Sequence, residues 1–385
     1  MEKIIVIGAG PAGLAAAINA KNKNNEVIIL EANEKIGKKL LITGAGKCNY
    51  LNDDFTKEHF RSNNLNKISN IFDKEKIKKF YNELGIVPVI KNGYYYPYSQ
   101  TSISVQNAYL LALKSKNIEV IYNEKVKNII INNGYLIITE NNTYRADKVV
   151  LATGGCTYPK TGSNGSGYKL LSNLNMDIVK PLPALTSLKI SGNFMRDWAG
   201  IRCPAEINLM INSKIVKTET GEIQLTDYGV SGICIMQLSG MAIKALENKD
   251  NVKLKINFLP EIENYKKFIS ERKERFKDRD IIELLEGLIN YKLLYALKKI
   301  GDIEKLITNL EVEVIGYNDF DKAQVTQGGL NLDMISNNFE TNYKGLYVVG
   351  ELLDVDGDCG GYNVGFATLS GIIAGSDIFD KSKTN

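Results

Sequence analysis

The residues best suited to chemistry lie within the first thirty-one positions. An apolar run, Ile4–Ile7, leads into a G-x-G-x-x-G segment, Gly8–Gly13, and a second apolar run, Val27–Leu30, ends on Glu31. A glycine-rich turn between a strand and a helix, followed by an acidic residue after the next strand, is typical of a site for an ADP-containing dinucleotide. The sequence therefore predicts that this segment binds the adenosine end of a cofactor.

Each part of this motif has a physical role. Gly8 allows the chain to turn tightly, Gly10 leaves room for a pyrophosphate, and Gly13 lets the helix pack close to the sheet. Pro11 suits the first helical turn because its missing N–H has no intrahelical partner there. The pyrophosphate is expected to lie against the free N–H groups of the helix. Glu31 is expected to accept hydrogen bonds from ribose hydroxyls and to repel a 2′-phosphate.

Two further segments are rich in glycine. Residues 37–49 contain three lysines and three glycines and end on Cys48 and Asn49. Backbone N–H groups and positive charge favour an anionic ligand, although a surface turn has a similar composition. The apolar run 148–151 ends on Ala152–Gly155, which predicts a buried parallel strand. Ligands of open α/β sheets bind beyond the carboxyl ends of such strands.

The composition excludes several classes of mechanism. Of 385 residues, 44% are hydrophobic and 24% are charged, and the net charge of +4 does not by itself indicate a nucleic-acid partner. His59 is the only histidine, which argues against histidine-based triads and most zinc chemistry, so no metal site is expected. Because His59 follows Asp53, Asp54 and Glu58, we expect it on the surface.

The cysteine pattern and the apolar runs favour a cytoplasmic protein. Five cysteines are widely separated and form no C-x-x-C pair, as expected in a reducing compartment rather than in a disulfide framework. The N-terminal apolar run is broken by glycines and a proline, unlike a signal peptide. No run approaches the roughly 18 apolar residues that a membrane span needs, so no membrane partner is expected. The sequence does not indicate the oligomeric state.

Changes in pattern along the chain predict three domains. Short alternating runs within residues 126–144 predict an antiparallel meander, and alternation from about residue 181 to residue 260 predicts a β-rich insertion. Residues 262–310 are helical in pattern, with 11 basic against 9 acidic residues, which is typical of a solvated helical face. The predicted domains are a discontinuous nucleotide-binding domain, 1–185 and 320–385; a β-rich inserted domain, 186–260 with about 311–319; and a helical inserted domain, 261–310.

The return of α/β character near the C-terminus favours FAD over NAD. FAD is long enough to need contacts from distant segments, and Glu351, after the predicted strand 345–349, is expected to hydrogen-bond its ribitol chain. The last helix begins near Asn363 and Val364. Its positive dipole end is expected to stabilise the anionic reduced flavin at N1 and O2. Only one dinucleotide fingerprint is present, so NADH or NADPH is expected as a transient electron donor.

In combination these segments resemble the YhiN-type flavoprotein family, which includes ribosomal RNA dihydrouridine synthases. The resemblance runs from residue 1 to about residue 375. It implies an α/β fold in which a Rossmann-type FAD-binding domain of the two-dinucleotide-binding type carries an inserted β-barrel-like domain and a helical domain. Many members have arginine at the position of Lys47, and lysine keeps the charge without the planar fork. The segments that carry the resemblance are Gly8–Gly13, Thr43–Asn49, Ala152–Gly155, Thr226–Gly232, Val325–Gly329, Gly350–Asp354 and Gly360–Asn363.

The motifs and the resemblance together give a predicted set of cofactor-binding residues. The set is Gly8, Gly10, Pro11, Ala12, Gly13, Glu31, Lys39, Gly44, Gly46, Lys47, Cys48, Asn49, Val126, Thr153, Gly154, Gly350, Glu351, Gly361, Asn363 and Val364.

The resemblance implies several reactions. One branch reduces a uridine of 23S ribosomal RNA to dihydrouridine, another reduces steroid enones, and some members are described as amine oxidases. The first two share hydride transfer from flavin N5 to the β carbon of a conjugated carbonyl, followed by protonation of the α carbon. We therefore expect an FAD-dependent oxidoreductase that reduces uridine in ribosomal RNA. The alternatives are a small-molecule enone reductase or amine oxidase, and a non-catalytic flavin-binding assembly or ribosome-associated protein.

Three residues are candidate proton donors: Cys48, Cys359 and Tyr362. The cationic loop around Cys48 would lower the pKa of its thiol, whereas a small residue packed against the cofactor is the alternative interpretation. Asp356 and Asp358 would raise the pKa of Cys359. Residues 152–155 also resemble the fumarate reductase type, although a single histidine argues against dicarboxylate chemistry.

Overall fold

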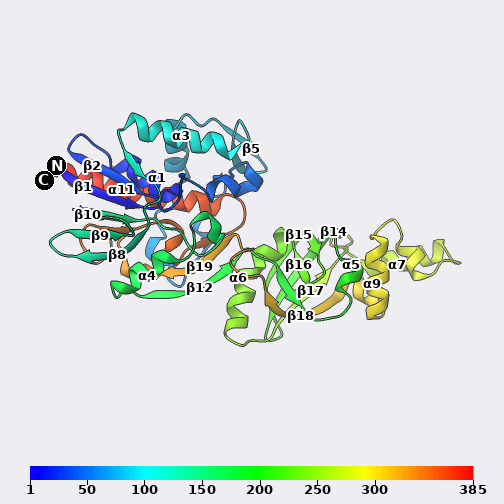
Figure 1. Ribbon diagram of the computed structural model, residues 1–385. Helices are drawn as coiled ribbons and strands as arrows, with labels where there is room; N and C mark the ends of the chain where they lie inside the picture. Colours follow the sequence, from blue (N-terminus) through cyan, green and yellow to red (C-terminus); the bar gives the residue numbers. More distant parts are fainter. Residues whose placement is uncertain (385) are drawn as a thin grey trace. The chain divides into compact units, whose positions relative to one another are not determined.

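The computed structural model describes residues 1–384, which divide into two compact units. Unit 1 comprises Met1–Pro181 and the C-terminal residues from Val325 onward, and unit 2 comprises Leu182–Gln324. In Figure 1, unit 1 runs from blue through cyan to the green of α4 and β12 and returns in orange and red, whereas unit 2 runs from green through yellow to the orange-yellow of β18. The two ends of the chain therefore build one unit. Residues 261–310, which the sequence predicts as a separate domain, belong to unit 2.

Unit 1 is built on a five-stranded parallel sheet. Strands β1 and β11 lie side by side, with Ile4 opposite Lys148 and Ile7 opposite Leu151. Their apolar residues are almost completely buried, as expected for central parallel strands that are covered on both faces. The predicted parallel strand at 148–151 is thus confirmed. The order across the sheet is β20 (Leu346–Val348), β11 (Lys148–Leu151), β1 (Glu2–Ile7), β2 (Asn25–Leu30) and β7 (Glu119–Ile121).

Helices α1 (Pro11–Ala20) and α11 (Tyr362–Thr384) pack closely against each other in unit 1, as the blue and red helices of Figure 1 show. Small residues make this approach possible. A Cβ atom at Gly371 would lie 2.2 Å from the Ala12 carbonyl oxygen, and one at Gly375 would lie 2.5 Å from that of Ala16. The packing brings Gly371, nine residues after the start of α11, beside Ala12 in the first turn of α1. No helix within residues 1–384 is both long enough and apolar enough to cross a membrane.

Shorter elements surround this core. The predicted meander is confirmed as β8 (Val126–Ile131), β9 (Tyr135–Thr139) and β10 (Thr143–Ala146). Three small sheets pair β3 (Leu51–Asn52) and β5 (Pro88–Lys91) with β6 (Tyr94–Pro97), β4 (Phe60–Arg61) with β21 (Asp356–Gly357), and β12 (Ile178–Ala184) with β19 (Val325–Leu330). The helices are α2 (Lys74–Glu83), α3 (Ser102–Ser115) and α4 (Ser166–Asn173). The 3-10 turns are η1 (Leu40–Gly46), η2 (Lys57–His59), η3 (Leu65–Ile68), η4 (Pro159–Thr161), η5 (Leu332–Met334) and η6 (Gly350–Leu352).

Unit 2 contains a closed antiparallel barrel, which confirms the predicted β-barrel-like insertion. Buried residues alternate with half-buried or exposed ones along strands such as β17 and β18, so one face of each strand points into a common core. That core also includes apolar residues of the helical segment, which explains why the segment is not a separate unit. The barrel order is β13 (Leu188–Ile190), β16 (Gly229–Ser231), β15 (Lys214–Leu225), β14 (Arg202–Ile211), β17 (Val252–Asn257) and β18 (Leu310–Tyr317). The helices of the segment are α7 (Tyr265–Arg275), α8 (Ile281–Leu285), α9 (Tyr291–Ile300) and α10 (Ile303–Asn309), and α5 (Met195–Trp198) packs on α9.

One helix of unit 2 differs from the sequence prediction. The stretch predicted to be β-rich contains α6 (Ile233–Glu247), a helix of 15 residues that begins after Gly232. Eight of its residues are buried, including Ile235, Leu238 and Ile243. A helix that is apolar over most of its surface lacks a clear 3.6-residue pattern, so the sequence does not distinguish it from a strand.

Candidate functional site

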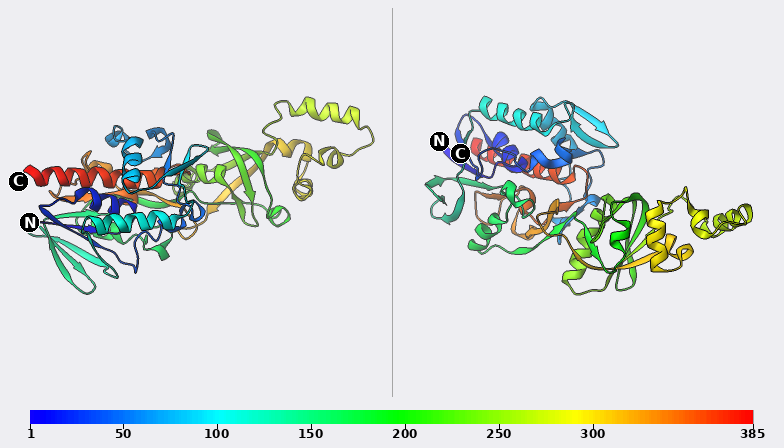
Figure 2. Two further views of the ribbon diagram at one scale, coloured as in Figure 1. Left: turned by 90° about the horizontal axis from the view of Figure 1, so that it is seen from above. Right: turned by 45° about the vertical axis from the view of Figure 1, so that its right-hand side comes forward.

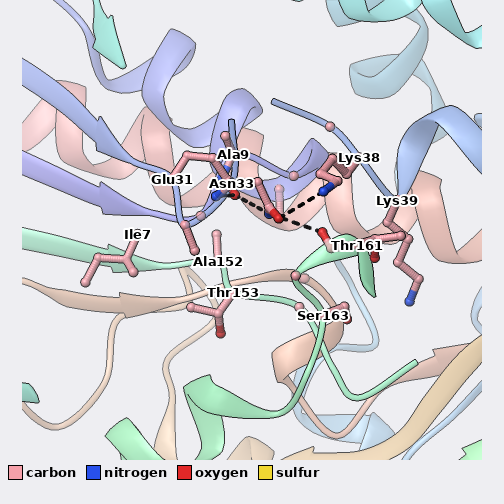
Figure 3. Close-up of a pocket in the computed structure, with 18 of the residues that line it drawn as sticks. Ile7, Ala9, Glu31, Asn33, Lys38, Lys39, Ala152, Thr153, Thr161 and Ser163 are labelled. Carbon is pink, nitrogen blue, oxygen red and sulfur yellow. Dashed lines mark hydrogen bonds between the residues drawn. The ribbon is translucent and has the colours of Figure 1, made fainter. Parts of the chain in front are cut away.

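A pocket lies at the carboxyl edge of the parallel sheet in unit 1. Its walls come from the turn after β1, the end of β2, the residues leading into η1, the start of β8, the end of β11 and the turn after β20 (Figure 3). It encloses about 950 Å³ of space free of protein atoms, part of which is open solvent. Eleven residues of the predicted cofactor set line this pocket: Gly8, Gly10, Pro11, Ala12, Glu31, Lys39, Val126, Thr153, Gly154, Gly350 and Glu351.

The three glycines of the opening motif meet different surroundings. A Cβ at Gly8, where φ is +103°, would lie 2.5 Å from the Ala152 carbonyl oxygen. A Cβ at Gly13 would lie 2.0 Å from the Gly8 carbonyl oxygen. A Cβ at Gly10 would meet nothing within 4 Å, although Gly10 lines the pocket. Gly8 and Gly13 are therefore required by the fold itself, whereas the room at Gly10 is open for a ligand.

Glu31 forms part of the pocket wall and is held there by backbone and side-chain donors. Its carboxylate accepts hydrogen bonds from the backbone N–H groups of Ala9 and Asn33, both at 2.8 Å, and from the Asn33 amide at 2.6 Å. The side chain of Asn33 also contacts Lys38 and the backbone of Thr161 (Figure 3). A carboxylate has about four lone-pair directions, so further donors can be accommodated. The Glu31 carboxylate thus lines the pocket and can accept further hydrogen bonds from a ligand.

Glu351, which also lines the pocket, joins three other segments of the chain. Its carboxylate pairs with the ammonium group of Lys39 at 2.6 Å. It also accepts hydrogen bonds from the Thr326 backbone N–H at 2.9 Å and the Thr157 hydroxyl at 3.1 Å. The adjacent Gly350 has φ of +74°, and a Cβ there would lie 2.8 Å from that of Ala12. The sequence predicts both Lys39 and Glu351 for the site but does not predict this ion pair, because 312 residues separate them.

The chemistry of the pocket lining fits an ADP-containing cofactor. The hydroxyls of Thr153 and Ser163 are buried and have no hydrogen-bond partner within residues 1–384, although both residues line the pocket. Buried hydroxyls normally form hydrogen bonds, and no described protein atom supplies a partner for these two. Both hydroxyls are therefore suited to bind a ligand in the pocket. The N-terminus of α1 adds free backbone N–H groups suited to a pyrophosphate. The predicted set did not include three of the lining residues, Asn33, Lys38 and Ser163. The only sequence signals for them were the position of Asn33 close to Glu31 and the positions of Lys38 and Ser163 in glycine-rich segments.

The remaining predicted residues lie elsewhere in unit 1. None of Gly13, Gly44, Gly46, Lys47, Cys48, Asn49, Gly361, Asn363 and Val364 is among the pocket-lining residues. The loop ending at Asn49 adjoins the start of α11, because the Asn49 side chain accepts a hydrogen bond from the Gly361 N–H at 3.3 Å. Asn363 binds its own chain, accepting from the Gly357 N–H at 2.7 Å. The loop ending at Asn49 and the start of α11 thus form a second group, whereas Gly13 lies against Gly8 beside the pocket.

Cys48 departs from the chemistry predicted for it. Its side chain is completely buried, and burial raises the pKa of the thiol to about 12 instead of lowering it. The lysines of the loop do not reverse this effect. The prediction of an activated thiol at Cys48 is therefore wrong, and the alternative of a small packed residue agrees with the structure.

His59 is partly exposed, with 27% of its side-chain surface accessible, and both of its ring nitrogens contact carboxylates. Its Nδ1 lies 3.0 Å from Asp358 Oδ2, and its Nε2 lies 2.9 Å from Asp54 Oδ2. The imidazole stacks on the ring of Tyr362, with 4.6 Å between ring centres. Burial lowers the pKa of His59, but hydrogen bonds to Asp358 and Asp54 outweigh burial and raise the pKa overall. We call His59, Asp54, Asp358 and Tyr362, together with Arg61, the His59 cluster.

Arg61 completes this cluster by binding two aspartates. It contacts Asp356 at 2.9 Å and Asp358 at 2.5 Å, which ties β4 to β21. Burial raises the pKa of Asp356 to about 6. The pKa of Cys359 is raised by burial and by Asp358, in the direction predicted. Burial likewise raises the pKa of Tyr362, so its phenol keeps its proton at neutral pH.

Comparisons with known proteins agree with this fold. The family model described as "HI0933-like protein Rossmann domain" matches residues 2–377. The 3-dehydro-bile acid delta(4,6)-reductase of Clostridium scindens is 31% identical over 97% of this chain and 98% of its own length. The ribosomal RNA dihydrouridine synthase of Haemophilus influenzae is 26% identical over 95% of this chain and 96% of its own length.

Among solved structures, the open conformation of a flavocytochrome c3 fumarate reductase matches with a TM-score of 0.53. It is 14% identical, and the match covers 99% of this chain and 79% of that one. A likeness at this level of identity describes the fold alone, and that fold is of the mixed α/β flavoprotein type.

Proposed function

Because the chain belongs to the HI0933-like Rossmann domain family of oxidoreductases, we propose that it is an FAD-dependent reductase of a conjugated C=C bond. The observation that carries the proposal is the pocket of unit 1, where Glu31, the open space at Gly10 and the Lys39–Glu351 pair lie on one continuous lining. When bound, FAD would supply the hydride. NADH or NADPH would reduce it transiently, since the chain has one dinucleotide fingerprint.

In this assignment the chain's own residues hold the two ends of the cofactor. Glu31 accepts hydrogen bonds from the adenosine ribose, and the N–H groups at the start of α1 bind the pyrophosphate. Glu351 accepts a hydrogen bond from the ribitol chain while Lys39 balances its charge. The unpaired hydroxyls of Thr153 and Ser163 supply two further contacts.

The substrate that we propose is a uridine of 23S ribosomal RNA, as in the relative from Haemophilus influenzae. A small-molecule enone is the second candidate, favoured by the 31% identity to a bile acid reductase. Both reactions saturate a C=C bond next to a carbonyl. Both reactions therefore need a proton donor close to the α carbon.

We assign that donor to Tyr362. Its hydroxyl forms no hydrogen bond within residues 1–384, and its raised pKa keeps the phenol protonated. The stacked ring of His59 fixes its orientation. Cys48 is unsuitable because it is completely buried, which leaves Cys359 as the alternative donor.

Two measurements test the proposal. The purified protein is expected to have a flavin absorption spectrum that bleaches with NADH or NADPH. Nucleoside mass spectrometry of 23S ribosomal RNA from a deletion strain is expected to show loss of one dihydrouridine, restored by the wild-type gene and not by a Glu351→Gln variant. If the dihydrouridine content is unchanged and 3-oxo-steroid enones rapidly reoxidise the flavin, the RNA substrate is refuted. The small-molecule enone then becomes the assigned substrate.

A further inference from the structure

Unit 2 carries a group of cations around one aromatic ring at the C-terminal end of α7. The guanidinium carbons of Arg272, Arg275 and Arg279 lie 5.5, 5.3 and 4.3 Å from the centre of the Phe276 ring. We call these four residues, together with Lys277, the Phe276 cluster. In Figures 1 and 2, α7 extends away from the barrel strands of its own unit.

The protein leaves much of the charge in this cluster unneutralised. Lys273, beside the cluster, pairs with Glu304 at 2.6 Å. By contrast, Arg275, Lys277 and Arg279 are exposed and form no ion pair within residues 1–384. Residues 272–279 contain five basic and two acidic side chains, so this turn carries a net +3 in a chain whose total is +4. A high local positive potential follows.

The stacking also orients the arginines. A cation–π contact uses the face of the guanidinium, whereas the N–H donors lie in its plane and point outward. Arg272 is held further by a hydrogen bond from its Nε to the Leu284 carbonyl at 2.8 Å. Arginines held on a ring lose little further freedom on binding, and their forked donors match two oxygens of one phosphate.

We propose that the Phe276 cluster binds the phosphodiester backbone of RNA. This inference rests on the proposed function, because an RNA substrate is a polyanion whose affinity comes largely from phosphate contacts. Such contacts position the RNA and do not read its sequence. A membrane surface is a poorer match, since Ile269 is the only fully buried residue of α7 and the rest of the helix is highly charged without an apolar face.

The test compares two triple variants of the full-length flavin-loaded protein. One is Arg275→Ala, Lys277→Ala and Arg279→Ala. The control removes the same charge from exposed positions of unit 1: Lys23→Ala, Lys114→Ala and Lys116→Ala. Binding of a fluorescent 23S ribosomal RNA transcript is measured against salt concentration. We expect the cluster variant to bind at least about tenfold more weakly at low salt and its salt slope to fall by about 2 to 3, with little change in the control.

A third variant, Phe276→Leu, keeps every cation and removes only the ring. It is expected to bind RNA more weakly than the wild type and more tightly than the triple variant, because the arginines lose their orientation. Melting temperature and flavin content show that each variant is folded. Equal weakening in the cluster variant and the control, or binding to anionic phospholipid vesicles in preference to RNA, would overturn the proposal. Since binding is measured without turnover, a protein that binds RNA through the cluster yet reduces no uridine would refute the proposed function alone.

Discussion

The pocket of unit 1 and the His59 cluster both join segments from opposite ends of the chain, but different forces hold them. The pocket is shaped by backbone atoms at glycines, where an added Cβ at Gly13 would lie 2.0 Å from a carbonyl oxygen. The His59 cluster is shaped by charged side chains, with Asp358 bound by both His59 and Arg61. A site made by backbone atoms tolerates almost no added volume. A site made by ion pairs tolerates shape changes but depends on protonation.

The largest expected effect comes from adding volume to the backbone-built region. Gly13→Ala should lower the free energy of unfolding by about 3 kcal/mol or more, because the Cβ collides with the Gly8 carbonyl oxygen. Urea denaturation measures this, and flavin absorbance should show loss of the cofactor. Gly10→Ala is the matched control. Its Cβ meets nothing within 4 Å, so it should unfold like the wild type while binding the cofactor more weakly. Equal stability of the two variants would contradict the role assigned to Gly13.

The second prediction concerns chemistry in the charge-built region. Tyr362→Phe keeps the ring that stacks on His59 and removes only the hydroxyl group. Substrate reduction should slow by about 10²–10⁴-fold, the range for loss of a general acid. Stopped-flow mixing should show unchanged flavin reduction by NADH or NADPH, since that step needs no proton from Tyr362. Cys48→Ser and Cys359→Ser should keep turnover. A large loss in Cys359→Ser with full activity in Tyr362→Phe would transfer the role to the thiol.

The two regions also differ in how far sequence predicts them. Gly8–Gly13 and Glu31 lie within one βαβ unit, so local pattern and spacing determine their positions. His59 meets Asp358 across 299 residues, and no periodicity encodes that contact. The sequence therefore predicts the sheet, the barrel and the pocket-lining positions of Gly8, Gly10 and Glu31, but it does not predict the carboxylate contacts of His59, and the lowered pKa considered for Cys48 is opposite to the shift that burial produces. Burial, which sets that shift, depends on long-range packing around the loop.

The Lys39–Glu351 pair tests whether ion pairs matter in the backbone-built pocket as well. The two side chains are 21% and 17% exposed, so neither is fully solvated. Glu351→Gln should lower the free energy of unfolding by about 1–3 kcal/mol, because Lys39 then lacks a partner. The double variant with Lys39→Met should recover part of the loss. Urea denaturation of all four proteins in a double-mutant cycle measures the coupling. No coupling would mean that the Thr326 backbone N–H and the Thr157 hydroxyl hold Glu351 without help from Lys39.

The smallest expected effect is a pH dependence confined to the charge-built region. Because folding raises the pKa of His59 above its usual 6.5, protonated His59 stabilises the folded state below that pH. This contribution is lost as the pH rises through the raised pKa. Burial raises the pKa of Asp356 from 3.8 to about 6, so protonated Asp356 also stabilises the folded state, and this contribution is lost as the pH rises from about 4 to about 6. His59→Gln should remove the part of the pH dependence that lies at the higher pH. The change in the free energy of unfolding should be less than about 1 kcal/mol, because the ring is partly exposed.

Urea denaturation of His59→Gln and the wild type across neutral pH isolates this contribution as the difference between the two curves. Asp358→Asn should reduce the difference more than Asp54→Asn, because Asp358 is buried and Asp54 is largely exposed, so water screens the second contact. Gly10→Ala should leave the pH dependence unchanged, since the backbone-built pocket lies outside the His59 cluster. Parallel curves for His59→Gln and the wild type would show that its hydrogen bonds to the carboxylates do not depend on its charge.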